Sequence, residues 1–230
     1  MFAKHPAIAR GQVNHAECRS KKMYKYFLVF LISLFCSAFF VPKKEALLRV
    51  AGPTIVMAVL MGMGIGLAYN KDALDDRSLY LLVGSVLFFI VGFMDDLGIF
   101  RLWWHRLVGQ ILVLSTIIPI AVPSGTGAVS SLPSVFGYMI VPLWFLAVIN
   151  LFLFLKNRWS LIGTLSLAIF CLLFLISQRL GNLQLAFASL APAGAILTFM
   201  VYNGFFSRLP LGSCGAMYIG FFISVISIML

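Results

Sequence analysis

Charged residues are scarce in this chain. It has 17 lysines and arginines and 7 acidic residues among 230, together 10% of the sequence, whereas 62% of the residues are hydrophobic. A chain with so few charges lacks the polar surface needed to cover a soluble globule. The sequence contains no DNA-binding motif and no Rossmann fingerprint, so nucleic acid is not an expected partner. We therefore expect an integral membrane protein whose main surroundings are the lipid bilayer.

Cysteine and histidine are also rare. The four cysteines show no paired spacing, and the three histidines are scattered along the sequence. This pattern argues against a disulfide framework, a zinc site and a histidine-based metal site. These residues are Cys18, Cys36, Cys171, Cys214, His5, His15 and His105.

What the chain has instead is a series of long apolar runs. Each run covers about 17–22 residues without the alternation of a membrane-spanning β-strand, which favours helices over a barrel. The sequence thus predicts an all-α, polytopic transmembrane bundle of about eight spans, forming a single domain over 24–230. The expected spans are 24–42, 47–69, 78–95, 105–123, 136–155, 160–177, 184–202 and 214–230.

The distribution of positive charge predicts the orientation. The connections 43–49, 96–106, 156–159 and 203–213 lie on one side of the membrane and carry eight lysines and arginines, which makes that side cytoplasmic. The basic tail over 1–23 conflicts with this topology, because it would lie outside. One hypothesis is that translation begins at Met23 and that the tail is an upstream over-extension of the reading frame.

Asp95 and Asp96 are the most informative residues. They end an apolar run of membrane-spanning length, where a carboxylate is costly, by about 2.5–3.5 kcal/mol if it reached the bilayer centre. A paired aspartate there is expected to face a polar cavity, a cation or a phosphate on the cytoplasmic side. The alternative is structural: the pair caps the following segment and binds Arg101 or Arg106.

The segment around the aspartates resembles a known family. The run 91–98 reads V-G-F-M-D-D-L-G, and Arg106 and Gln110 follow in the next expected helix. This pattern is similar to the polyprenyl-phosphate N-acetylhexosamine-1-phosphate transferases of glycosyltransferase family 4. They include undecaprenyl-phosphate GlcNAc-1-phosphate and phospho-MurNAc-pentapeptide transferases. The resemblance implies a multi-pass protein of the bacterial inner membrane, acting in cell-envelope biogenesis with Asp95 and Asp96 as catalytic residues.

The same resemblance implies substrates and a cofactor. Members of the family move a sugar-1-phosphate from a UDP-sugar to undecaprenyl phosphate, with Mg²⁺. On this basis Asp95 and Asp96 are also the expected metal ligands, because Mg²⁺ binds through carboxylates and substrate phosphates. Arg106, Asn150 and Asn203 are the implied substrate-binding residues. Family members usually continue beyond the third shared motif into a loop with functional histidines, which has no counterpart here.

Two downstream motifs of the family can be placed on this chain, but their acidic residues are replaced. The N-x-x-N-x-x-D-G-x-D-G-L segment falls on 150–161, where Lys156 and Trp159 stand at the two aspartate positions. The F-N-x-x-P-A-x-x-F-x-G-D-x-G-S segment falls on 202–216, where Ser213 stands at the aspartate position. We expect Lys156 either to pair with Asp95 or Asp96, in place of the missing cation, or to extend to the lipid headgroups.

Two functional hypotheses follow. The first is an active transferase of minimal form, in which one carboxylate pair suffices. The second is a catalytically inactive member that keeps the fold and acts as a membrane partner or a lipid-phosphate binder. In addition, Gly62 and Gly66 form a G-x-x-x-G motif, which predicts close helix packing within the bundle or in a homodimer.

Overall fold

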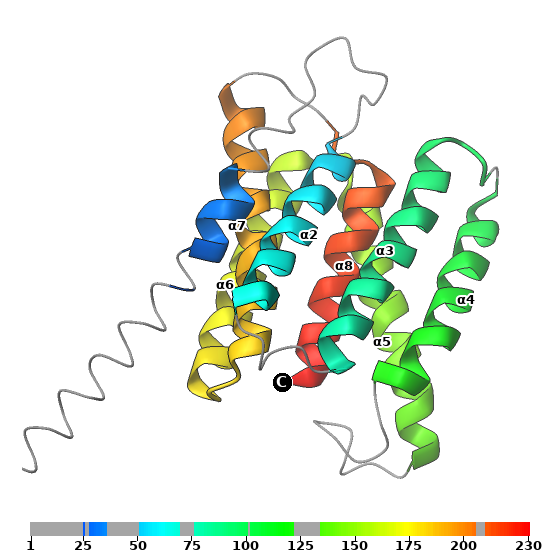
Figure 1. The fold of residues 1–230 in the computed structure, drawn as a ribbon. Helices are drawn as coiled ribbons and strands as arrows, with labels where there is room; N and C mark the ends of the chain where they lie inside the picture. The colour runs from blue at the N-terminus through cyan, green and yellow to red at the C-terminus, as the bar shows by residue number, and fades with distance from the viewer. Residues whose placement is uncertain are drawn as a thin grey trace, which may run out of the picture.

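The computed structural model describes residues 25, 28–35, 51–69, 76–100, 102–121, 134–205 and 210–230. All regular structure in these ranges is helical, and no strand occurs in them. A short helical segment covers 28–35, and seven longer helices follow it (Figure 1). They are α2 (Gly52–Tyr69), α3 (Asp76–Asp96), α4 (Trp103–Ala121), α5 (Ser134–Leu155), α6 (Trp159–Arg179), α7 (Leu183–Phe205) and α8 (Gly212–Met229).

This architecture confirms the predicted helical bundle. Within the described ranges, three helices are long and apolar enough to cross a membrane: Trp159–Arg179, Gln184–Phe205 and Gly212–Met229. Shorter apolar stretches occupy Gly52–Gly64 and Met139–Leu155. The first predicted span, 24–42, falls within the described residues only at 25 and 28–35, and the N-terminal tail lies outside them.

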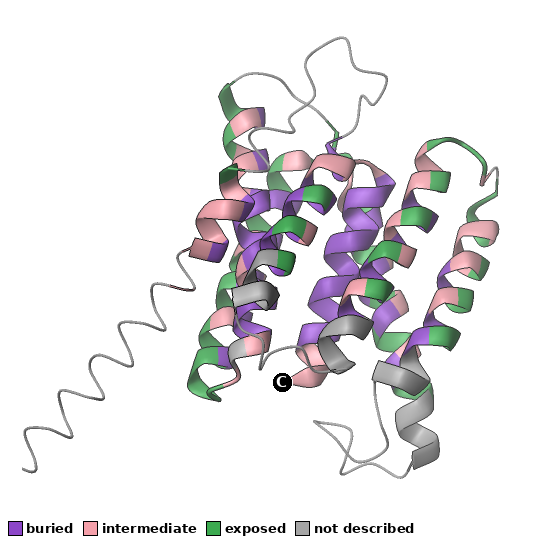
Figure 2. Cartoon of the chain, viewed as in Figure 1, coloured by how far each residue is buried: buried purple, intermediate pink, exposed green. Residues whose placement is uncertain are grey.

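Helix α8 forms the centre of the bundle. Every residue of α8 from Ser213 to Ile226 is buried, which Figure 2 shows as a continuous buried helix. It packs most extensively against α3 and α5, with further contacts to α2, α7 and α6. Small residues permit this crowding: a Cβ on Gly220 would lie 2.8 Å from the Cα of Ile149 in α5. Helices α3 and α5 thus both pack directly against one buried helix.

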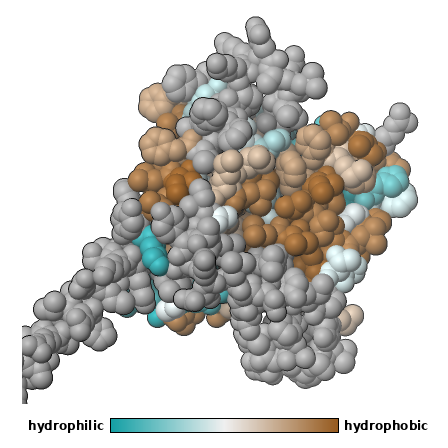
Figure 3. Space-filling model, in the orientation of Figure 1, coloured by the Kyte–Doolittle hydropathy of each residue, from teal (hydrophilic) through white to brown (hydrophobic). Residues whose placement is uncertain are grey.

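The outer helices carry apolar side chains on their exposed faces. On α3 these include Val83, Val86 and Ile90, and on α4 they include Ile111 and Leu112. Figure 3 shows that hydrophobic surface dominates the visible described part of the molecule. A contiguous exposed apolar surface of this kind indicates contact with lipid or with another protein. Because the helices are long enough to span a membrane, we interpret this apolar surface as the surface that contacts lipid.

The turns are formed by residues suited to them. Between α6 and α7, Gly181 has a φ of +71° and the Asn182 side chain accepts a hydrogen bond from Leu185 N at 3.3 Å, which caps α7. The predicted role of Gly62 in helix packing is confirmed within the chain. A Cβ there would lie 3.1 Å from Ser33 Cβ and 3.4 Å from Ala191 Cβ.

Candidate functional site

The site begins at the last turn of α3, which ends in a Schellman motif. Gly98 N donates to Asp95 O at 3.0 Å, and Ile99 N donates to Met94 O at 3.1 Å. Gly98 takes the left-handed conformation that this motif requires, with a φ of +74°. The motif places both aspartates at a helix C-terminus, where the helix dipole disfavours negative charge. Each carboxylate therefore needs a positively polarised partner.

Asp96 finds its partner at the N-terminus of α8. Its Oδ1 accepts a hydrogen bond from Ser213 N at 2.7 Å, and its Oδ2 accepts one from Cys214 N at 2.9 Å. The N-cap residue of α8 is Leu211, which has no side-chain acceptor. Asp96 thus caps α8 from another helix, and both of its oxygens are engaged in doing so.

Close approach of the two helices makes this cap possible. A Cβ on Gly92 would lie 2.5 Å from Cys214 Cα and 2.9 Å from Cys214 N, so only glycine fits at this crossing of α3 and α8. Helix α2 also approaches the start of α8 closely, because a Cβ on Gly52 would lie 2.7 Å from Gly215 N. Gly212, which begins α8, has a φ of +79°, a left-handed conformation that glycine adopts readily in a tight turn.

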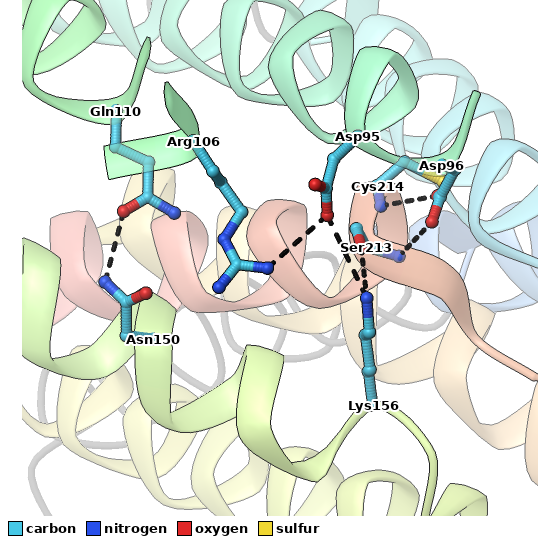
Figure 4. A network of polar contacts seen from close by, with 8 residues as sticks. All are labelled: Asp95, Asp96, Arg106, Gln110, Asn150, Lys156, Ser213 and Cys214. Atoms are coloured by element: carbon cyan, nitrogen blue, oxygen red, sulfur yellow. Dashed lines mark hydrogen bonds and ion pairs between the residues drawn. The ribbon is translucent and has the colours of Figure 1, made fainter. Parts of the chain in front are cut away.

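Asp95 faces two cations instead. Its Oδ2 lies 3.6 Å from Arg106 Nη1, on α4, and 3.9 Å from Lys156 Nζ, in the turn between α5 and α6. Lys156 Nζ also donates a hydrogen bond to Ser213 Oγ at 2.6 Å. Figure 4 shows Lys156 extending from below toward both Asp95 and Ser213. The side chain of Asp95 is only 11% exposed, against 24% for Arg106 and 29% for Lys156, so water reaches the cations more than the carboxylate.

A second polar contact lies beside Arg106, one helical turn along α4. Asn150 Nδ2, on α5, donates to Gln110 Oε1 at 3.1 Å and to Leu146 O at 2.8 Å. Gln110 is fully buried. Among the described residues, its Nε2 and the buried Nε of Arg106 have no acceptor. These two buried donors lie on the same face of α4 and lack an acceptor among the described residues, and a buried donor of this kind would be satisfied by an acceptor such as a phosphate oxygen.

The structure brings together most of the residues that the sequence singled out. Lys156 and Ser213, at positions where the resemblance implies aspartates, meet at Asp95 and Asp96, and the predicted pairing of Lys156 with Asp95 is confirmed. Asn150, an implied substrate-binding residue, forms an interhelical hydrogen bond with Gln110. The expected pairing of Asp95 with Arg106 is also present, whereas Arg101 lies outside the described residues.

Two other expected residues are not among those drawn in Figure 4. Trp159 begins α6 and packs against the hydrophobic core, and Asn203 is buried in α7. The sequence did not reveal that Asp96 would cap α8 or that Gln110 would bind Asn150. Each depends on which helices are neighbours, although Gly92 four residues before Asp96 was a signal of close helix contact.

The side chains present do not fit a magnesium site. Both oxygens of Asp96 accept backbone hydrogen bonds, and Asp95 already faces two fixed cations within 4 Å. The described residues include no group of three or more histidines, cysteines and acidic residues that could hold a metal ion. Two carboxylates and two cations already balance in charge, so an added dication would be repelled by Lys156 and Arg106.

Comparison of the sequence with known proteins shows which family the chain belongs to. The sequence model of "Glycosyl transferase family 4" matches residues 78–230, which include α4–α8 and all eight residues of the network. Two phospho-N-acetylmuramoyl-pentapeptide-transferases, from two strains of Clostridium perfringens, are 25% identical to the chain over 207 residues. These alignments cover 82% of this chain and 62% and 61% of the relatives, so the chain spans about three fifths of their length. The chain belongs to glycosyl transferase family 4, a family of membrane phospho-sugar transferases.

Proposed function

We propose that this chain is a lipid-phosphate-binding member of its family that does not catalyse magnesium-dependent sugar-1-phosphate transfer. Its ligand is the phosphate of a polyprenyl carrier of the undecaprenyl type, in the inner membrane of a bacterium. The observation that carries the proposal is the position of Lys156 Nζ, 3.9 Å from Asp95 Oδ2 and 2.6 Å from Ser213 Oγ. An ammonium group occupies the place where transfer chemistry calls for acidic residues.

The argument against transfer rests on charge. Passing a phosphoryl group from a sugar nucleotide to a lipid phosphate brings two anions together, and a metal ion held by carboxylates normally offsets their repulsion. Here one carboxylate caps α8 and the other binds Arg106 and Lys156. Of the four carboxylate oxygens at the site, only Asp95 Oδ1 lies outside the described contacts, and it belongs to a carboxylate that already faces two cations, so the expected Mg²⁺ cofactor has no unpaired carboxylate to bind.

The argument for binding rests on the unused donors of α4. Arg106 Nε and Gln110 Nε2 are buried and have no acceptor among the described residues. Phosphate oxygens only accept hydrogen bonds, so a lipid phosphate matches these donors. Beyond them, α4 exposes Val108, Ile111 and Leu112, along which a polyprenyl chain can lie in the bilayer.

The active transferase is the second candidate. The chain retains Asp95, Asp96, Arg106 and Gln110, and its two Clostridium perfringens relatives are named for transfer of phospho-N-acetylmuramoyl-pentapeptide. In this case Asp95 and Asp96 are the catalytic and metal-binding residues. The substrates are a UDP-sugar and undecaprenyl phosphate, and Lys156 must leave Asp95 when they bind.

Two measurements on the purified protein in lipid nanodiscs separate the candidates. The first is exchange of radiolabelled UMP into UDP-GlcNAc, and into UDP-MurNAc-pentapeptide, with undecaprenyl phosphate and Mg²⁺. An active family member serves as the positive control. We expect no exchange. Exchange that is lost in Asp95→Asn would overturn the proposal and establish the transferase.

The second measurement is native mass spectrometry with undecaprenyl phosphate, compared with the uncharged polyprenol. We expect preferential retention of the phosphate, weakened about tenfold in Gln110→Leu or Arg106→Met because each loses a donor to a charged acceptor. Arg158→Met is the matched control, because Arg158 is an exposed cation in the turn before α6. Equal retention of polyprenol and its phosphate would contradict the binding function.

A further inference from the structure

The carboxylate site contains a cation that belongs to the chain itself. Lys156 Nζ lies 3.9 Å from Asp95 Oδ2 and donates to Ser213 Oγ at 2.6 Å, and Ser213 N in turn donates to Asp96 Oδ1 at 2.7 Å. This chain of contacts joins the end of α3, the turn after α5 and the start of α8 (Figure 4). One ammonium group therefore connects three elements at the point where they meet.

We propose that the Lys156 ammonium is the resident cation of this site and makes the folded protein independent of divalent metal. Asp95 and Asp96 are adjacent carboxylates at a helix C-terminus, an arrangement that the helix dipole disfavours without a nearby positive charge. Lys156 and Arg106 supply two positive charges for the two negative ones. Both carboxylates already have partners, Asp96 through both oxygens and Asp95 through Oδ2, so a divalent ion would have to compete with these contacts and meets repulsion from both cations.

Serine at position 213 completes the arrangement. A hydroxyl accepts the hydrogen bond of the ammonium without adding charge, and the contact distance of 2.6 Å fits that role. An aspartate at position 213 beside a lysine at 156 would add a negative charge that leaves the site unbalanced. The two residues at the family's acidic positions therefore act together: one supplies the cation and the other accepts its hydrogen bond.

The proposal predicts how stability responds to metal. In detergent, the thermal midpoint Tm of the unchanged protein is expected to be the same in EDTA and in millimolar MgCl₂ at matched ionic strength. Lys156→Met is expected to lower Tm by about 2–4 °C, because the carboxylates lose a positive neighbour at a site that is partly screened by water. Arg158→Met, two residues along the same turn, is expected to leave Tm unchanged.

Restoring the acids should restore the metal site. The double variant Lys156→Asp/Ser213→Asp is expected to have a lower Tm in EDTA, because four carboxylates then repel one another. Its Tm should rise saturably with MgCl₂ and not with added NaCl. A Tm of the unchanged protein that rises with MgCl₂ would overturn the proposal, and so would a Lys156→Met variant as stable as the unchanged protein.

A second readout does not depend on the double variant folding. Titration of the unchanged protein with Mn²⁺, followed by electron paramagnetic resonance, is expected to show no saturable binding at the site; saturable binding that is lost in Asp95→Asn would overturn the proposal. The proposal shares the Lys156 contact with the proposed function. Its tests use neither lipid carrier nor sugar nucleotide, so the two can fail separately.

Discussion

Asp95 and Asp96 are neighbours in sequence but have different tasks. Asp96 turns to the backbone N–H groups of α8, whereas Asp95 turns to the side chains of Arg106 and Lys156. Successive residues on a helix point about 100° apart, which is why adjacent carboxylates reach different neighbours. The G-F-M-D-D run therefore combines one helix-capping residue and one ion-pairing residue.

Replacing Asp96 tests the cap. In Asp96→Ala the N–H groups of Ser213 and Cys214 lose their acceptor at a half-buried position, so we expect the free energy of unfolding to fall by about 1–3 kcal/mol. Asp96→Asn keeps one acceptor oxygen without the charge and should lie between Ala and the unchanged protein. Denaturant unfolding in mixed micelles measures this order. Equal stability of all three proteins would contradict a capping role.

The sequence allowed the pairing of Asp95 to be predicted, but not the cap. Lys156 and Arg106 are long cations whose reach makes a contact with a nearby carboxylate plausible from the motif positions alone. The partner of Asp96 is backbone, and every residue except proline offers an N–H group, so the sequence does not distinguish one helix N-terminus from another. Leu211 at the N-cap of α8 is a clue only once α8 is known to begin at Gly212.

At the scale of helices, the crossing of α3 and α8 positions the site. Gly92 is the contact residue, because a Cβ there would press on the backbone of Cys214, which cannot rotate away. The apolar runs predict the boundaries of such helices to within a few residues. For example, the predicted span 160–177 corresponds to α6, which covers Trp159–Arg179. Prolines 142 and 192 do not interrupt α5 and α7, since helices in lipid tolerate proline.

Gly92→Ala tests this crossing against a matched control. We expect the variant to lose about 1–3 kcal/mol of stability, because α3 and α8 must move apart and the Asp96 cap weakens. Gly64→Ala, in α2, is the control, since a Cβ there meets nothing within 4 Å and alanine favours the helix. Thermal unfolding of both variants in the same detergent gives the comparison, and equal midpoints would contradict the close approach.

The contact between α4 and α5 gives a further prediction at this scale. Gln110 is fully buried and accepts from Asn150 across the helix pair. A double-mutant cycle with Gln110→Leu and Asn150→Leu should give a coupling free energy of about 0.6–2 kcal/mol, the range for interhelical hydrogen bonds in membrane proteins. Additive effects of the two substitutions would indicate that the side chains act independently.

For the whole molecule, the sequence predicted a helical bundle but not its centre. Helix α8 is no more apolar than its neighbours, yet among the described helices it is the one with an unbroken buried run, from Ser213 to Ile226. Gly215 and Gly220 explain this, because they let α2 and α5 approach its backbone closely. Small residues in a membrane helix indicate close packing, but they do not reveal how many neighbours surround it. That information is present only in the assembled bundle.

The orientation of the bundle in the membrane provides the last prediction. Lys156 and Arg158 lie just before α6 begins and Arg179 lies at its end, so the two ends of one helix can be compared directly. The excess of lysine and arginine in the connections on the Asp95 side predicts that this end faces the cytoplasm. A single cysteine in place of Asn157 or of Gln178, both exposed, reports on one end each.

We expect a membrane-impermeant maleimide to label Asn157→Cys only in inverted membrane vesicles and Gln178→Cys only in right-side-out vesicles, in a background without the native cysteines. This result would mean that the carboxylate site faces the cytoplasm. A lipid phosphate in the cytoplasmic leaflet or a soluble nucleotide could then reach it. Reversed labelling would place Asp95 and Lys156 outside and contradict the orientation predicted by the positive-inside rule. It would also contradict the transferase candidate, since a UDP-sugar is a cytoplasmic substrate. Because α6 spans about 30 Å at 1.5 Å per residue, simultaneous labelling of both ends from one side would contradict a membrane-spanning α6 altogether.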